Sequence, residues 1–130
     1  MPRGLSRRSS GSRAYRKGYL FELLVRDELA GMGLVVYRVA RSSGKPRSAG
    51  VGYPPVDLIA FLPDGRALFV ECKLQEPSRA QLERMREAAQ ALPGLYFVVT
   101  RGNLEGFLEE VRSLVASASN KNVTGARQAG

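Results

Sequence analysis

The sequence contains no histidine and only one cysteine, Cys72. Without these residues the chain cannot build a zinc finger, a Cys-His nucleophile pair, a Ser-His-Asp triad or an internal disulfide. It also lacks an apolar run near the ~18 residues of a membrane span, and its N-terminus is rich in Arg, Ser and Gly instead of carrying an apolar signal core. Any catalysis must therefore use carboxylates, lysine and hydroxyl groups, and we expect a cytoplasmic protein that does not enter a membrane.

Positive charge, in contrast, is in excess. Twenty Lys and Arg residues against twelve Asp and Glu give a formal net charge of +8. Such a chain is attracted to polyanions, because each phosphate that it neutralises releases condensed counterions. Nucleic acid is the first expectation, ahead of an acidic membrane, although basic runs are often only solvated tails. The candidate nucleic-acid-binding residues are Arg13, Arg16, Lys17, Arg38, Arg41, Ser43, Lys45 and Arg47.

At 130 residues the chain has room for one domain with a single core. We expect a mobile basic arm over residues 1–14, a folded domain over 15–115 and a flexible tail over 116–130. The hydrophobic patterns predict helices and strands in the order helix 16–32, strand 34–39, exposed loop 40–55, strands 56–61 and 67–72, helix 78–91, strand 95–100 and helix 103–115. A helix between the last two strands favours their parallel pairing. The expected fold is α/β, with a mixed sheet of four or five strands flanked by helices.

Two acidic residues are expected at the open end of a β-hairpin. The Pro-Asp-Gly at 63–65 is a turn signal between two apolar runs. Asp57 opens the first strand and Glu71 closes the second, so antiparallel pairing makes these carboxylates neighbours. Two adjacent carboxylates repel unless a cation lies between them, and their hard oxygen atoms suit Mg²⁺ or Mn²⁺.

Lys73 is the third member of this candidate site. Side chains alternate across a strand, so Glu71 and Lys73 share one face while Cys72 points to the other, and the Cys72 carbonyl could add a metal ligand. A lysine in this position can orient or help deprotonate an attacking water and can stabilise charge on a phosphate. The same residues could instead form ordinary surface pairs at a strand end, because the D-x(n)-E-x-K pattern alone is weak.

Two further polar residues have simple structural explanations. Glu22 could pair with Arg26 one helical turn later. Gln81, three positions after Ser78, could complete a capping box at the start of a helix. Neither residue alone indicates a functional site.

Together, these features resemble the archaeal Holliday junction resolvases, which belong to the PD-(D/E)XK, or restriction-endonuclease-like, nuclease superfamily. The resemblance extends over roughly residues 16–100 and is carried by positions 17–18, 33–38, 42–44, 55–60 and 70–73, with Glu22 and Gln81.

That resemblance implies a restriction-endonuclease-like fold in which Asp57 and Glu71 bind the metal and Lys73 is the catalytic lysine. It implies that Glu22 is a further essential acid near the metal and that Gln81 supports the site. A loop serine, Ser42 or else Ser43, would assist at the scissile phosphate. The resemblance also implies a homodimer that binds a four-way DNA junction and nicks two opposed strands.

The sequence therefore predicts a Mg²⁺- or Mn²⁺-dependent, structure-selective DNA endonuclease that resolves Holliday junctions in recombination and repair. Two alternatives remain open. One is another endonuclease of the same superfamily, acting on flaps, duplex DNA or RNA. The other is a non-catalytic nucleic-acid-binding module that retains the fold.

Overall fold

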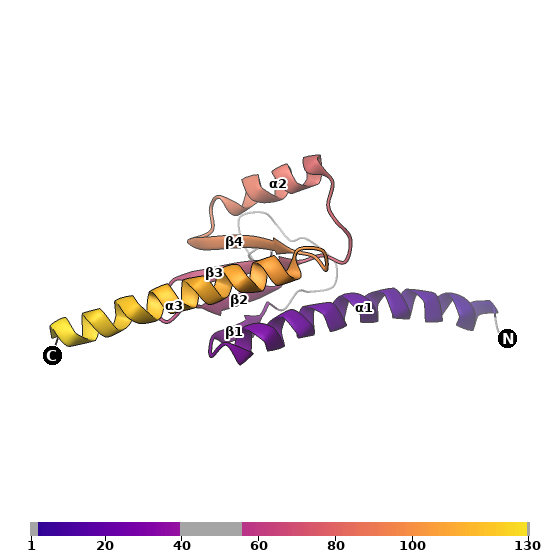
Figure 1. The fold of residues 1–130 in the computed structure, drawn as a ribbon. Helices are drawn as coiled ribbons and strands as arrows, with labels where there is room; N and C mark the ends of the chain where they lie inside the picture. The colour runs from indigo at the N-terminus through magenta and orange to yellow at the C-terminus, as the bar shows by residue number, and fades with distance from the viewer. Residues whose placement is uncertain (1–2, 40–55, 130) are drawn as a thin grey trace.

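A computed structural model describes the backbone of residues 3–39 and 56–129, and the side chains of 16–39 and 56–120. Within these ranges the elements follow in the order α1 (Arg3–Gly31), β1 (Val35–Arg38), β2 (Leu58–Phe61), β3 (Ala67–Cys72), α2 (Arg79–Ala89), β4 (Gly94–Val99) and α3 (Leu104–Ala129). Figure 1 shows α1 and α3 running across the sheet and extending beyond it in opposite directions, while α2 lies beyond β4. None of the described helices is long and apolar enough to cross a membrane.

The described strands form one mixed sheet in the order β1-β2-β3-β4. β2 pairs antiparallel with both β1 and β3, and its register with β3 places Leu58 opposite Val70. The turn of the β2–β3 hairpin contains Gly65 with a φ of 93°, a conformation that glycine adopts without steric cost. β4 pairs parallel with β3 after the crossover through α2. The predicted hairpin, the parallel pairing and the mixed four-stranded α/β sheet are thus confirmed.

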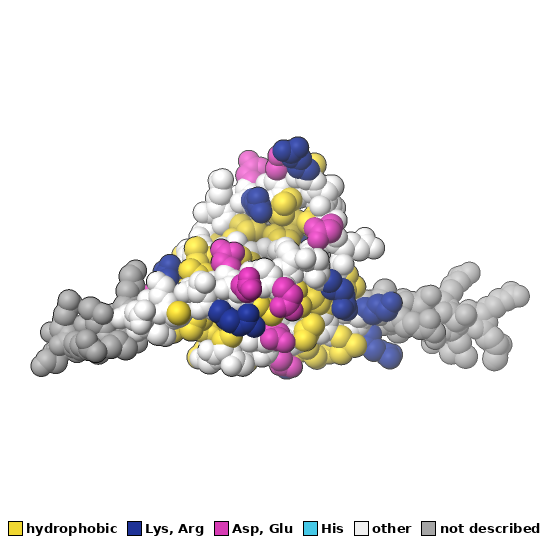
Figure 2. Space-filling model, viewed as in Figure 1, with side chains coloured by type: hydrophobic (Ala, Val, Ile, Leu, Met, Phe, Trp, Pro, Cys, Tyr) yellow, Lys and Arg dark blue, Asp and Glu magenta, His cyan; other side chains and the backbone are white. Residues whose placement is uncertain are grey.

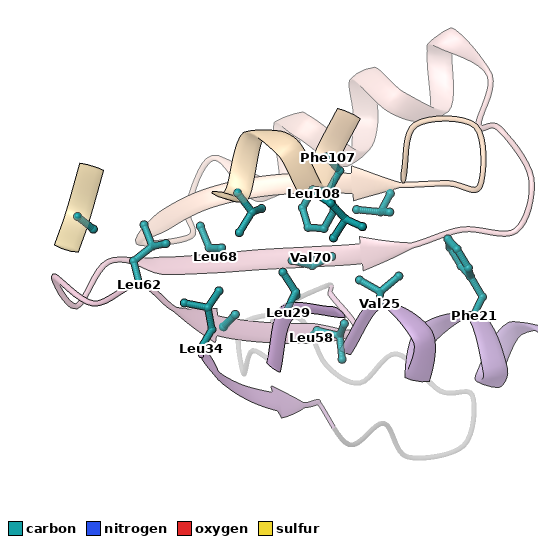
Figure 3. Close-up of a cluster of buried hydrophobic side chains, with 14 residues drawn as sticks. Phe21, Val25, Leu29, Leu34, Leu58, Leu62, Leu68, Val70, Phe107 and Leu108 are labelled. Atoms are coloured by element: carbon teal, nitrogen blue, oxygen red, sulfur yellow. The ribbon is translucent and has the colours of Figure 1, made fainter. Parts of the chain in front are cut away.

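The larger hydrophobic core lies between the sheet and the helices α1 and α3 (Figure 3). α1 contributes Phe21, Val25 and Leu29, whose four-residue spacing puts them on one helical face. This face packs on alternate strand residues and on one side of α3, including Leu58, Ala60, Leu68, Val70, Phe107, Leu108 and Val111. A smaller cluster of Val56, Ala67 and Phe69 forms on the opposite side of the sheet. Because both faces of β3 are buried along most of its length, the end of this strand is held in a fixed position.

Two helices are longer than the sequence predicted. α1 begins at Arg3 instead of near residue 16, and α3 continues to Ala129 instead of ending near residue 115. Apolar periodicity marks only the part of a helix that packs on a core, whereas a helix can continue wherever its residues tolerate the conformation. Residues 3–14 and 116–129 are therefore helical, and the mobility expected of both ends stays a prediction.

Charge is divided unevenly along the chain. Residues 16–39 and 56–120 contain eleven Lys and Arg and all twelve Asp and Glu, a net charge of −1. The remaining segments, 1–15, 40–55 and 121–130, contain nine Lys and Arg and no acidic residue, a net charge of +9. Figure 2 accordingly shows side chains of both signs interspersed over the folded body. The excess positive charge of the protein thus belongs to residues whose side chains lie outside the described ranges.

Candidate active site

Asp57 lies one residue before β2 and holds the end of β3. Its backbone N–H donates a hydrogen bond to the Val70 carbonyl at 2.9 Å, and its Oδ2 accepts one from the Cys72 N–H at 2.8 Å. The paired register of the two strands ends at Leu58 and Val70, and these two hydrogen bonds attach Asp57 to the segment 70–72, which contains Glu71. The structure therefore brings Asp57 to the end of β3 that carries Glu71, as the hairpin argument predicted.

Both carboxylate oxygens of Glu71 have partners. Oε1 accepts a hydrogen bond of 2.7 Å from the Tyr96 hydroxyl, and Oε2 lies 3.7 Å from Lys73 Nζ. Tyr96 is on β4, two residues before Val98, which pairs with Glu71 across the parallel strands. Burial, and then the hydrogen bond to Glu71, raise the pKa of Tyr96 well above its usual value. The phenol therefore stays protonated and acts as a donor that fixes the orientation of Glu71.

Cys72 follows Glu71 at the end of β3. Its side chain packs against the larger core, on the face away from Glu71 and Lys73, as strand alternation predicted. Burial raises the pKa of the thiol far above its usual value, and the negative charges of Asp57, Glu22 and Glu71 raise it further. The thiol therefore stays protonated, and Asp57, Glu71 and the α1 residue Glu22 each contribute negative charge to its surroundings.

The partner of Glu22 is Arg38 and not Arg26. Glu22 Oε2 accepts a hydrogen bond of 2.6 Å from Arg38 Nε. The Arg38 guanidinium also lies over the Tyr19 ring, 4.8 Å from its centroid, whereas Arg26 pairs with the adjacent Asp27. The pairing expected within the helix is therefore wrong, because packing of α1 on the sheet brings the end of β1 within reach. Arg38, a candidate nucleic-acid-binding residue, is part of this ion pair.

Gln81 forms the capping box that its spacing from Ser78 predicted. Its Oε1 accepts a hydrogen bond from the Ser78 N–H at 2.8 Å, and its own N–H donates to Ser78 Oγ at 3.1 Å. Gln81 also lines a cleft that contains Glu71 and Lys73. Its structural role is thus confirmed, and its support of the chemistry stays a prediction.

This cleft, of about 640 Å³, lies between the end of β3 and α2. Arg84 contributes to its wall from α2, and Glu76 contributes from the β3–α2 connection. Glu76 Oε2 accepts a hydrogen bond of 2.7 Å from the buried Thr100 hydroxyl, which ties this connection to the end of β4. Glu76, Arg84 and Tyr96 were not among the site residues predicted from the sequence. Alternation along a strand parallel to β3 could have indicated Tyr96, but no local signal marks Glu76 or Arg84.

The remaining candidates from the sequence are placed only in part. Arg16 and Lys17 are exposed on α1. The side chain of Arg13 lies outside the described residues, as do all the candidates of the 40–55 segment, namely Arg41, Ser42, Ser43, Lys45 and Arg47.

The donor atoms of the hairpin end are compatible with a hard divalent cation. In the part of the chain whose side chains are described, no cluster of three or more His, Cys, Asp or Glu side chains is arranged to hold a metal ion. Mg²⁺, however, is commonly bound through one or two carboxylates, several waters and phosphate oxygens of the substrate. Asp57 and Glu71 provide such a pair, while Glu22 is engaged with Arg38. The residues present thus fit a two-carboxylate site that is completed by solvent and substrate.

The Cys72 thiol should react slowly in the folded protein. Thiol reagents attack the thiolate, and its raised pKa, together with burial, keeps this form scarce at pH 8. We expect labelling by a chromogenic disulfide to be slower than in denaturant by more than about tenfold. Since Cys72 is the only cysteine in the chain, the absorbance change reports this site alone. Equal rates in the folded and unfolded protein would contradict the packing of this partly buried thiol against the core.

The site as a whole combines the carboxylates of Asp57 and Glu71, a lysine and a phenol donor, and Glu71 and Lys73 line an open cleft. This combination suits electrostatic and acid–base chemistry on an anionic substrate. Comparison of the chain with family models, curated proteins and solved structures gives no match. The assignment of a function therefore depends on the residues of the site themselves.

Proposed function

We propose that this chain is a metal-dependent, structure-selective DNA endonuclease that resolves four-way Holliday junctions in recombination and repair. The main support is the meeting of Asp57 and Glu71 at the open end of the hairpin, with Lys73 Nζ 3.7 Å from Glu71. The proposal includes a restriction-endonuclease-like fold, with which the strand order and the single parallel pairing are compatible. It also includes a homodimer, since resolution of a junction requires two symmetric cuts.

In this proposal Asp57 and Glu71 would hold Mg²⁺ or Mn²⁺. The ion would neutralise charge on the scissile phosphate and make water more acidic. Lys73, on the same face as Glu71, orients the attacking water and stabilises the negative charge that develops on the phosphate. Tyr96 donates to Glu71 Oε1 and so keeps the other oxygen directed to Lys73. Glu22, which is paired with Arg38, would be the further acid of the site.

The uneven division of positive charge along the chain supports DNA as the substrate. The segments 1–15, 40–55 and 121–130 carry a net charge of +9, whereas the folded body is almost neutral. Arginine and lysine bind phosphates whatever the base sequence, and they position a duplex without reading it. A selective nuclease of this kind recognises the shape of the DNA backbone more than its bases.

Cleavage of synthetic DNA tests the proposal directly. We expect the purified protein with Mg²⁺ or Mn²⁺ to cut a four-way junction into nicked duplexes, and EDTA to prevent cutting. Linear duplex of the same sequence should be cut far more slowly. Equal cutting of both substrates would reject the junction resolvase and favour another endonuclease of the same superfamily. Binding of the junction without cutting in any divalent metal would leave a non-catalytic nucleic-acid-binding module.

A further inference from the structure

The cleft beside the candidate site has one wall from a single face of α2. Gln81, Arg84, Met85 and Ala88 line it, and their spacing of three and four residues places them on the same side of the helix. The opposite wall is the end of β3, including Lys73, and the connection that follows it. The cleft therefore includes Glu71 and Lys73 of the candidate site.

The charges in this cleft are not equivalent. Glu71 is bound by Tyr96 and lies near Lys73, and Glu76 accepts the Thr100 hydroxyl. Arg84, in contrast, makes no hydrogen bond or ion pair with any residue whose side chain is described. A guanidinium with five N–H donors thus lines the cleft across from the Lys73 ammonium, while the acidic groups already have donors.

Part of the cleft lining is apolar. Leu74, Pro77 and Met85 contribute to it, and Leu74 is exposed although it is a large hydrophobic residue. A volume of about 640 Å³ is within the range of about 300–1,000 Å³ that sites for small organic ligands occupy. Apolar walls and cations on both sides match a nucleotide, which presents a phosphate together with the faces of a sugar and a base.

We propose that this cleft seats the DNA strand next to the scissile phosphate, with Arg84 binding a backbone phosphate adjacent to the one at Lys73. The inference depends on the proposed nuclease function and names the part of the site that holds the strand. Arginine is well suited to this role, because its planar guanidinium binds phosphate through two parallel hydrogen bonds. Arg84 is then a substrate-binding residue, and its loss weakens binding without changing the chemistry at Lys73.

Arg79 provides a matched control for Arg84. It lies on the same helix, is exposed and does not line the cleft. Arg84→Gln and Arg79→Gln remove the same charge from α2, so only position relative to the cleft distinguishes them. Arg84→Lys keeps a positive charge that can bind phosphate as a point charge. Thermal unfolding of each variant verifies that the fold is retained.

Binding is measured by fluorescence anisotropy of a labelled four-way junction in EDTA, over a series of salt concentrations. We expect Arg84→Gln to weaken binding about tenfold and to reduce the slope of log K against log salt by about 0.9, as loss of one phosphate contact requires. Arg84→Lys should restore most of the affinity, and Arg79→Gln should stay within about twofold of wild type. In Mg²⁺, the KM for the junction should rise in Arg84→Gln while kcat stays nearly constant.

The inference is overturned if Arg84→Gln and Arg79→Gln weaken binding equally, or if Arg84→Gln binds as wild type does. The anisotropy assay needs no cleavage, so its result is separate from that of the proposed function. If Arg84→Gln selectively loses affinity but the wild-type protein does not cut, the proposal that the cleft binds DNA stands and the proposed nuclease activity is rejected. Cutting by wild type with no effect of Arg84→Gln would retain the nuclease and reject the cleft.

Discussion

Asp57→Asn is expected to reduce cleavage of a four-way junction by about a thousandfold or more while the protein stays folded. The substitution removes the charge that would bind the metal, and a loss of several kcal/mol of transition-state stabilisation corresponds to that factor. Asparagine retains an oxygen that can accept the Cys72 N–H, which Asp57 Oδ2 accepts at 2.8 Å. Junction binding in EDTA should be unchanged or tighter, because repulsion between the carboxylate and phosphate is relieved. Rates of cutting in Mg²⁺ and affinities in EDTA measure the two effects.

Two control variants separate chemistry from structure at this position. Asp57→Ala also leaves the Cys72 N–H without its acceptor, so it should lower the free energy of unfolding by about 1–3 kcal/mol. Asp64→Asn makes the same change of charge at the other end of the hairpin, where Asp64 pairs with Arg66, and cutting should be nearly unaffected. If Asp57→Asn cut the junction at the wild-type rate, the role of Asp57 would be limited to its hydrogen bond with β3, and the proposed metal site would be contradicted.

Gly94→Ala is expected to lower the free energy of unfolding by about 2–3 kcal/mol, the cost of overpacking a well-packed region. Gly94 begins β4 and pairs with Ala67 of β3. A Cβ at this position would collide with the Ala67 carbonyl oxygen and would lie 2.9 Å from Cε2 of Phe69. The backbone oxygen cannot move without separating β3 from β4. Urea unfolding followed by circular dichroism measures the change.

Gly106→Ala is the matched control. Gly106 is exposed in α3, and a Cβ there would meet nothing within 4 Å. Gly106 lies in the first turn of α3, where the preference for alanine over glycine is smaller than the about 0.8–1.0 kcal/mol of a helix interior, so this variant should be at least as stable as wild type. If Gly94→Ala were as stable as Gly106→Ala, the close pairing of β3 and β4 at this end of the sheet would be wrong.

The sheet and the centre of the candidate site were predictable from the sequence because their signals are local. A turn at 63–65 joined two apolar runs, and this fixed both the hairpin and the meeting of Asp57 with Glu71. Strand alternation then placed Lys73 beside Glu71 and turned Cys72 into the core. These inferences need only the period of a strand and the chemistry of a turn.

Features that depend on contacts between distant segments could not be predicted. Nothing near Glu22 in the sequence identifies Arg38, since their pairing follows from how α1 lies on the sheet. The contact between Tyr96 and Glu71 requires the exact register of β3 against β4. The helix ends were wrong for another reason, because apolar spacing records where a helix is buried and not where it stops.

The β2–β3 hairpin is also the most local pairing in the sheet. Residues 62–66 separate its strands, whereas 73–93 separate β3 from β4. Closing a short loop costs less chain entropy, and contacts between near neighbours form faster. We therefore expect Asp57 and Glu71 to meet before β4 brings the Tyr96 hydroxyl to Glu71. During that interval Lys73 offsets only part of the repulsion between the two negative charges, so a variant that neutralises either carboxylate should fold faster than wild type.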